Sequence, residues 1–296
     1  MSGSGEFHYR LPIAVGGYRP GSHRGSSLGA GQEFAAYARL FDKPDPRRID
    51  LRASLRTTMR NVRREWLVRS YRQRAAVSVH AVVDVSASMR FGAQRPKLHV
   101  VADFAESLGH STFRAGDPVG LLAFDSDERA DLYLPARHSR GVGSAMGELL
   151  RECADRAADD APRAAGHGVA IERTVERLAG KTALVFLVSD FHWPLDRLDA
   201  TLDTLAHACV IPIVVWDPAE IEPPKDDGLL AVRDAESGAR RSLWVGRELR
   251  GRWRDRVAER RADLEAIFAA RSIRPFYLHA AFDPEALSRY FLEGLA

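Results

Sequence analysis

The chain has 296 residues, of which 45% are hydrophobic and 28% are charged, a balance typical of folded globular proteins. No apolar run approaches the roughly 20 residues that cross a bilayer, and the first residues lack the apolar core of a signal peptide. We therefore expect a cytoplasmic protein without a membrane span. The two cysteines, Cys153 and Cys209, stand far apart, which excludes a readable disulfide framework or zinc site.

The formal charge is +3, but the basic residues are unevenly distributed. Residues 47–74 hold ten arginines against two acidic residues, which predicts a strong local positive field. Three regions follow from composition: a flexible, Gly- and Ser-rich N-terminal segment at 1–30, an arginine-rich appendage at 31–74, and one large domain at 75–296. Apolar residues interrupt the charges of the appendage and suggest a small element packed beside the large domain: Leu51, Leu55, Val62, Trp66 and Val68.

The large domain begins with a β-branched apolar run at 75–84, the pattern of a strand buried on both faces. Helical spacing follows at 96–115 and ends at Gly116, a typical C-cap. Residues 117–124 predict a second strand with a hairpin partner at 129–134, and helices follow at 141–158 and 168–179.

The second half continues the alternation. Strands are predicted at 183–189, 210–216 and 272–279, helices at 196–208 and 246–271, a hairpin at 229–245, and a terminal helix after Asp283. Strands that alternate with helices in this way predict an α/β fold with a doubly wound, mainly parallel sheet.

Oxygen-bearing side chains follow the first buried strand. Asp84, Ser86 and Ser88 stand at alternating positions where that strand ends, and Asp190 closes a second buried strand. Ligands of open α/β sheets bind at this edge, and carboxylate and hydroxyl oxygens are ligands that Mg²⁺ or Mn²⁺ prefers. Local turn chemistry and helix capping are the alternative explanations. His192 and Trp193, just past Asp190, are predicted to line the rim of this candidate site.

The Asp-x-Ser-x-Ser pattern resembles the signature of von Willebrand factor type A (vWA) domains, whose metal-ion-dependent adhesion site holds a divalent cation that a partner's carboxylate completes. The resemblance implies Mg²⁺ or another divalent cation on Asp84, Ser86, Ser88 and Asp190. It also implies a threonine from a second loop, which this chain lacks. His167 occupies the corresponding position, and Ser144 in GVGSAMG is a poorer substitute.

A second resemblance, independent of the first, is to the MoxR-associated vWA family of bacteria, and most of all to its MxaS-type members from methanol oxidation clusters. The resemblance to the family rests on two phrases before the metal strand, represented here by Gly29, Gly31, Glu33, Phe34, Asp45, Arg47, Ile49 and Asp50. The likeness to the MxaS-type members rests on the stretches RPGSHRGSSLGAGQEF and DVSASMRFG. The resemblance implies a non-catalytic adaptor that works with a MoxR-type AAA+ ATPase to mature or activate a client enzyme, with methanol dehydrogenase as a candidate.

Other functions receive less support. The chain has no GxxxxGK[ST] and no HExxH, and no GxSxG elbow supports Ser86 or Ser88 as a nucleophile. A metal-dependent hydrolase stays open as a third hypothesis. The alternative from another class is a nucleic-acid-associated vWA protein that uses the arginines of 47–74, with Trp66 and Tyr71 available for stacking. No nucleic-acid motif accompanies that charge, so nucleic acid is the less expected partner.

Overall fold

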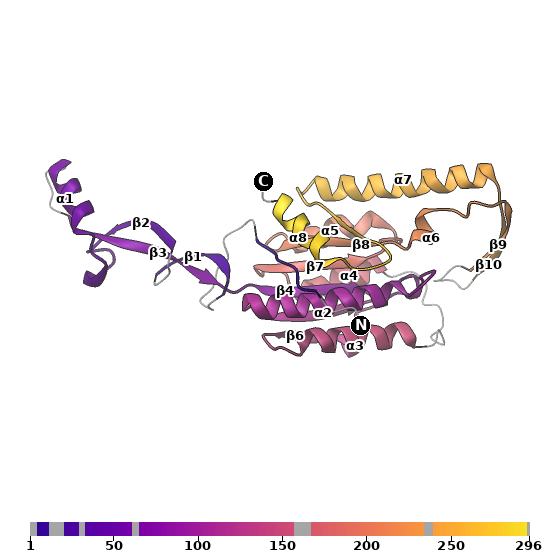
Figure 1. The fold of residues 1–296 in the computed structure, drawn as a ribbon, viewed down its shortest axis with the longest axis horizontal. Coiled ribbons are helices and arrows are strands. Elements are labelled where there is room, and N and C mark those ends of the chain that lie inside the picture. Colours follow the sequence, from indigo (N-terminus) through magenta and orange to yellow (C-terminus); the bar gives the residue numbers. More distant parts are fainter. Residues whose placement is uncertain are drawn as a thin grey trace. The chain divides into compact units, whose positions relative to one another are not determined.

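The computed structural model describes residues 5–11, 21–29, 33–60, 65–156, 167–233 and 239–294 (Figure 1). The chain divides into a main unit, residues 1–10 and 78–296, and a small unit, residues 11–77. These boundaries differ from the predicted 1–30, 31–74 and 75–296, because the first ten residues join the main unit and the small unit begins at residue 11. Within the described ranges, no helix is long and apolar enough to cross a membrane.

The main unit is built on a six-stranded sheet with the order β11-β8-β7-β4-β5-β6. All neighbouring pairs are parallel except β5 and β6, which are antiparallel. The predicted α/β fold with a mainly parallel sheet is thereby confirmed. The strands are β4 (Ser78–Asp84), β5 (Val119–Phe124), β6 (Leu134–Arg137), β7 (Ala183–Ser189), β8 (Cys209–Val215) and β11 (Phe276–Leu278).

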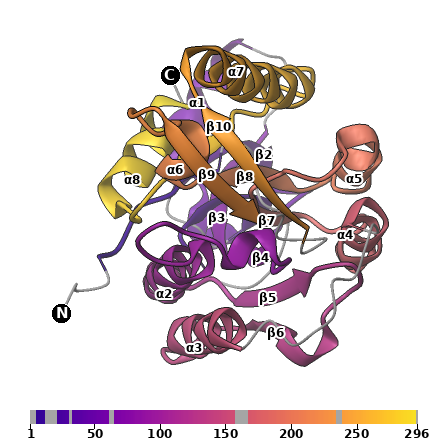
Figure 2. The same ribbon diagram turned by 90° about the vertical axis from the view of Figure 1, so that its right-hand side faces the viewer.

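Helices cover both faces of this sheet, with α2 and α8 on one face and α4 and α5 on the other (Figure 2). The helices are α2 (Lys97–Ala115), α3 (Val142–Asp155), α4 (His167–Glu176), α5 (Leu198–Thr204), α6 (Pro218–Ile221), α7 (Arg247–Ala269) and α8 (Pro284–Glu293). A separate hairpin of β9 (Gly228–Arg233) and β10 (Arg240–Val245) precedes α7. Every residue of β5 and β7 is buried, which explains why these strands are continuous apolar runs.

Sequence signals at element ends match the observed caps. Gly116 ends α2 with φ of 83°, a left-handed conformation that glycine adopts without steric cost. Asp283 accepts a hydrogen bond from the Glu285 N–H at the start of α8. The predicted hairpin partner at 129–134 was placed too early in the chain. Residues 130–132 form a short 3-10 helix, and the antiparallel partner of β5 is β6, which begins at Leu134.

The N-terminal segment contributes to the core of the main unit, contrary to the expectation for residues 1–30. Phe7 is 1% exposed. Its ring lies against five others, from Tyr9, Phe104, Phe186, Phe282 and Phe291. Two aromatic residues, Phe7 and Tyr9, in a Gly- and Ser-rich stretch make no extended periodic pattern, so the pattern could not reveal these contacts.

In the residues that the structure describes, the small unit contains a three-stranded antiparallel sheet, one α-helix and a short 3-10 helix at Pro46–Arg48. The strands β1 (His23–Gly29), β3 (Leu67–Ala75) and β2 (Glu33–Arg39) pair in that order, and α1 (Leu51–Arg60) precedes β3. Of the apolar residues that predicted a packed element, Val68 is buried, but Leu51, Leu55 and Trp66 are more than half exposed. Val62 lies outside the described residues.

Two glycines test the packing of the helices. A Cβ on Gly109 in α2 would lie 2.2 Å from the Gly143 Cα of α3, whereas a Cβ on Gly251 in α7 meets no atom within 4 Å. We expect Gly109→Ala to lower the free energy of unfolding by about 1–3 kcal/mol through overpacking. Gly251→Ala should raise it by roughly 0.5–1 kcal/mol, because alanine favours the helix. Denaturant unfolding measures both, and equal effects would contradict the close approach of α2 and α3.

His80 makes the stability of the main unit depend on pH, at a position in β4 away from the carboxyl end of the strand. Burial, with help from the charge of Lys181, lowers the pKa of His80 from 6.5 to about 4, and its Nε2 lies 2.9 Å from the Ser78 Oγ. Between pH 6.5 and 4, His80 is therefore protonated in the unfolded chain but not in the folded chain. As a result, the free energy of unfolding falls as the pH drops. In His80→Gln, the drop in the free energy of unfolding between pH 6.5 and 4 should be smaller by about 1–3 kcal/mol, since one pKa unit is worth about 1.4 kcal/mol. Parallel pH–stability curves for the two proteins would refute the assignment.

Candidate functional site

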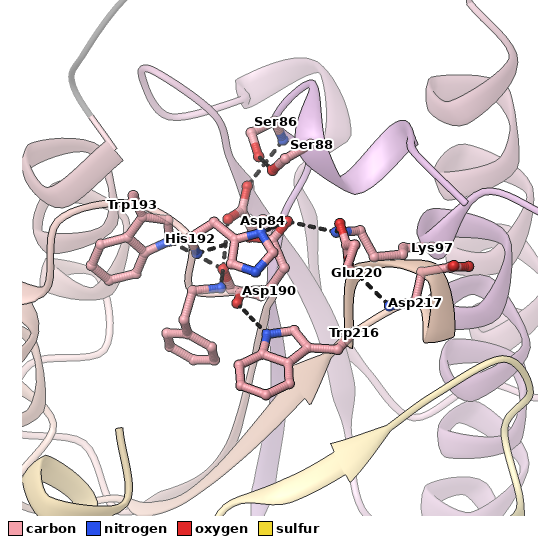
Figure 3. A network of polar contacts seen from close by, with 12 residues as sticks. Asp84, Ser86, Ser88, Lys97, Asp190, His192, Trp193, Trp216, Asp217 and Glu220 are labelled. Carbon is pink, nitrogen blue, oxygen red and sulfur yellow. Dashed lines mark hydrogen bonds and ion pairs between the residues drawn. The ribbon is translucent and has the colours of Figure 1, made fainter. Parts of the chain in front are cut away.

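The structure brings together four of the residues that the sequence singled out. Asp84 ends β4, and Asp190 directly follows β7, the strand paired beside it. Ser86 and Ser88 lie in the loop after β4, with their hydroxyl oxygens 3.1 Å apart (Figure 3). We call this group at the C-terminal edge of the sheet the mouth.

Asp84 is fully buried, and the groups that bond it are neutral. Its Oδ1 accepts from the Ser86 N–H at 3.0 Å, and its Oδ2 accepts from the Ser189 hydroxyl at 2.6 Å. Burial, followed by the nearby charge of Asp190, raises the pKa of Asp84 to about 6. Within the described part of the chain, the hydrogen-bond donors to this carboxylate are hydroxyl and amide groups rather than a cationic side chain.

Asp190, by contrast, is bonded to a buried cation. Its Oδ2 lies 2.8 Å from the Lys97 Nζ, which also lies 2.7 Å from Glu220 Oε1. Burial opposes the ionisation of Asp190, but the charges of Lys97 and His192 outweigh it and lower its pKa to about 2. Burial also disfavours the charge of Lys97, yet the two carboxylates raise its pKa, so the ammonium stays charged.

The loop after Asp190 is strained and held from two sides. Phe191 has φ of 52°, which is costly for a residue with a Cβ, and its N–H donates to the Ser189 Oγ. Arg260 of α7 donates to the carbonyls of Phe191 and Trp193. Trp216 donates from Nε1 to the Asp190 carbonyl at 2.8 Å. The backbone of this loop is therefore fixed before any ligand arrives.

The two predicted rim residues differ in exposure. The side chain of His192 is 41% exposed, and its Nδ1 lies 3.5 Å from Asp190 Oδ2. Trp193 is only 6% exposed, because its indole N–H donates to the Ser189 Oγ and its ring packs against Phe191. His192 thus lies at the solvent-exposed edge of the mouth, whereas Trp193 is buried and packs against the loop.

Of the two second-loop candidates, the structure places Ser144 away from the mouth and does not describe the side chain of His167. Ser144 is exposed near the start of α3, beside Gly143, which packs on Gly109 in the C-terminal half of α2. The mouth lies at the opposite end of α2, where Lys97 begins the helix. His167 begins α4, but its side chain lies outside the described structure.

A divalent cation fits the residues around Asp84 but not those around Asp190. Asp190, His192 and Glu220 offer ligand atoms within 4.8 Å of one another, but the Lys97 ammonium is already bonded to two of them and would repel a second cation. Asp84 and the hydroxyls of Ser86 and Ser88 present hard oxygens, and the Asp84 carboxylate is buried among neutral donors. These three residues fit a cation such as Mg²⁺.

Several residues that contact the mouth were not predicted from the sequence, notably Lys97, Ser189, Trp216 and Glu220. Of these, Lys97 was the one that the sequence could have indicated. It is one of four lysines in a chain with 39 arginines, and it stands at the first turn of the predicted helix after the Asp-x-Ser-x-Ser loop. The ammonium of a lysine is a compact point charge, and here it lies between two carboxylate oxygens.

A cavity of about 250 Å³ adjoins the mouth. Apolar and aromatic side chains form its walls, His192 and Glu220 connect it to the mouth, and two arginines of α7 lie along it. The indole N–H of Trp253 donates to the Glu220 carbonyl, so that ring is fixed in place. The lining residues are His192, Trp216, Glu220, Ile221, Trp253, Arg256, Val257 and Arg260.

Fold and site together define an α/β protein with a mainly parallel sheet and an acid–hydroxyl mouth at the carboxyl ends of its strands. The chain belongs to the family described as "Protein of unknown function DUF58", which matches residues 42–263. A relative in Mycobacterium tuberculosis, named "Uncharacterized protein Rv1480", is 30% identical over 86% of this chain and 75% of its own length. A relative in Mycobacterium bovis, "Uncharacterized protein Mb1516", matches to the same extent.

Solved structures similar to this chain include an aerotolerance-related membrane protein from Bacteroides fragilis and the conserved hypothetical protein BatB from Bacteroides thetaiotaomicron. Each is 15% identical, with a TM-score of 0.39. The match covers 74% of this chain and 98% of each solved chain.

The buried ion pair of the mouth is testable by mutation. Lys97→Met leaves Asp190 buried without its cation, and we expect the free energy of unfolding to fall by about 3–5 kcal/mol. Adding Asp190→Asn should recover part of this loss, because the uncompensated charge is removed. Arg95→Met is the matched control, since it breaks a half-exposed ion pair with Asp103 worth roughly 0–1 kcal/mol. Additive losses in the double variant would show that Lys97 and Asp190 do not interact.

Proposed function

We propose that the protein is a non-catalytic adaptor that binds a protein partner through the mouth. The observation that carries the proposal is Asp84, a fully buried carboxylate among neutral donors beside two hydroxyls at a strand edge. Such an arrangement costs stability, and costly polar groups at the ligand-binding edge of a sheet are typical of functional sites.

The residues in and around the mouth have different roles in the proposed binding. Lys97 fixes Asp190, and the loop after Asp190 is held rigid by Arg260 and Trp216. A divalent cation on Asp84, Ser86 and Ser88 would supply positive charge for a partner's carboxylate. The adjoining cavity offers aromatic walls to an apolar side chain next to that carboxylate. We therefore expect the partner to present an acidic residue beside an apolar one.

The bonding of the serines supports a binding role rather than catalysis. Ser189 donates to Asp84 and accepts from both the Phe191 N–H and the Trp193 indole, so its hydroxyl is occupied and buried. The Ser86 hydroxyl is bonded to that of Ser88. Ser189 is fully buried and these three bonds occupy its oxygen, so its hydroxyl is not exposed to a substrate that it could attack.

The partner we propose is a MoxR-type AAA+ ATPase, with a client enzyme that the pair matures or activates. This identification is supported by the sequence resemblance at 29–50 and by the binding character of the mouth. A role in maturing methanol dehydrogenase rests on the sequence resemblance alone and stays a prediction, as does a cytoplasmic location. Membership in the DUF58 family adds no support for the nucleic-acid alternative.

Asp84→Asn separates binding from folding. In EDTA, this variant should unfold at nearly the same temperature as the wild type. It loses a buried negative charge and keeps an acceptor for Ser189, which offsets the lost hydrogen bond from the Ser86 N–H. Added Mg²⁺ should raise the melting temperature of the wild type but not of the variant, since a ligand stabilises only the form that binds it. Capture of the purified ATPase should fall at least tenfold in the variant.

The outcomes distinguish the forms of the proposal. Capture that EDTA abolishes and Mg²⁺ restores would establish a metal-dependent adhesion site. Capture that ignores EDTA but fails with Asp84→Asn would establish binding by the loops alone. If neither treatment changes capture, the mouth is not the interface, and the proposal fails.

A further inference from the structure

The helix α1 of the small unit exposes its apolar side chains and buries a polar one. Leu51 and Leu55 lie one turn apart, on the same side of the helix, and are 61% and 60% exposed. Ser54, between them in sequence, is only 2% exposed. This reverses the usual orientation of an amphipathic helix, whose apolar side faces its own protein.

Polar contacts fix the helix in this orientation. The Ser54 hydroxyl donates to the Asp50 carbonyl at 2.7 Å and accepts from the Leu67 N–H of β3 at 2.8 Å. The Asp50 carboxylate accepts from the Ala53 N–H, which caps the helix, and from the Arg69 guanidinium at 2.8 Å. The leucines therefore contribute little to the fold of their own unit.

Two aromatic residues come close to the same end of the sheet. The Trp66 carbonyl accepts from the Leu40 N–H, and the Asp50 N–H donates to the Leu67 carbonyl, so the backbone at 40, 50 and 66–67 converges there. Trp66 is 51% exposed, and Phe41, next to Leu40, is 95% exposed. We call the four exposed residues the apolar tip: Phe41, Leu51, Leu55 and Trp66.

Positive charge surrounds the apolar tip. Arg52 and Arg56 are exposed on α1, and neither forms an ion pair with any residue in the part of the chain that the structure describes. The small unit as a whole carries 14 Arg and Lys against five Asp and Glu, whereas the rest of the chain carries 29 against 35. The excess of positive charge is therefore confined to the unit that exposes the leucines.

We propose that the apolar tip binds the surface of an anionic lipid bilayer. Leucine, tryptophan and phenylalanine side chains insert at the boundary between headgroups and acyl chains, while neighbouring arginines bind lipid phosphates. A nucleic acid would engage the arginines but gain nothing from two exposed leucines on a convex helix. A bilayer satisfies both features at once, and one short helix gives it a reversible contact rather than a span.

The test uses the full chain and vesicles of phosphatidylcholine, with or without phosphatidylserine. The wild type should cosediment with the anionic vesicles and much less with the neutral ones, and salt should weaken this binding. Leu51→Ser with Leu55→Ser should reduce it about tenfold or more, as should Arg52→Ser with Arg56→Ser. Leu229→Ser is the matched control, because Leu229 is 72% exposed on β9 of the main unit and should change nothing.

Three results would overturn the proposal. One is a wild type that stays in solution with anionic vesicles. Another is binding that depends on the arginines alone, which would indicate a general polyanion surface and is checked with a nucleic-acid oligomer. The third is equal loss in the Leu229 control. Circular dichroism verifies that each variant is folded. Asp84→Asn should bind vesicles like the wild type, so this experiment and the test of the mouth fail independently.

Discussion

The geometry of the mouth depends on one buried cation, the ammonium of Lys97. It begins α2 and bonds Asp190, after β7, and Glu220, in α6 after β8, so it ties together the connections that follow three different strands. Glu220 in turn accepts from the Asp217 N–H, and Asp217 accepts from the Ala93 N–H in the loop before α2. Because a buried charge without a partner costs several kcal/mol, these loops cannot move apart independently.

This cation also assigns different roles to the two acids of the mouth. Asp190 is paired, and its charged neighbours outweigh the effect of burial, so it stays ionised and fixed in place. Asp84 is bonded by neutral groups, and burial raises its pKa. Two carboxylates at one strand edge would repel each other if neither were compensated. Lys97 neutralises one acid, so the other can stay available to a ligand.

The sequence predicted the parts of this structure that depend on local pattern. The strand at 183–189 was placed to the residue, because a continuous apolar run has few alternatives, and parallel strands that end in Asp84 and Asp190 necessarily meet at one edge. What it missed depends on contacts between distant residues. Lys97 reaches Glu220 across 123 positions, and Phe7 reaches a core built much later in the chain.

The orientation of α1 shows a different limit. The spacing of Leu51 and Leu55 predicts an amphipathic helix, but the pattern cannot tell which side faces the protein. Ser54 and Asp50 decide this, because their hydrogen bonds to β3 and to the helix start can form only if the polar side turns inward. The same bonds leave the leucines beside Arg52 and Arg56, which form no ion pair among the described residues. The small unit thus leaves two leucines exposed that it could have buried, which fits the binding role that we propose for this surface. The main unit likewise contains a costly feature at its proposed binding site, the buried carboxylate of Asp84.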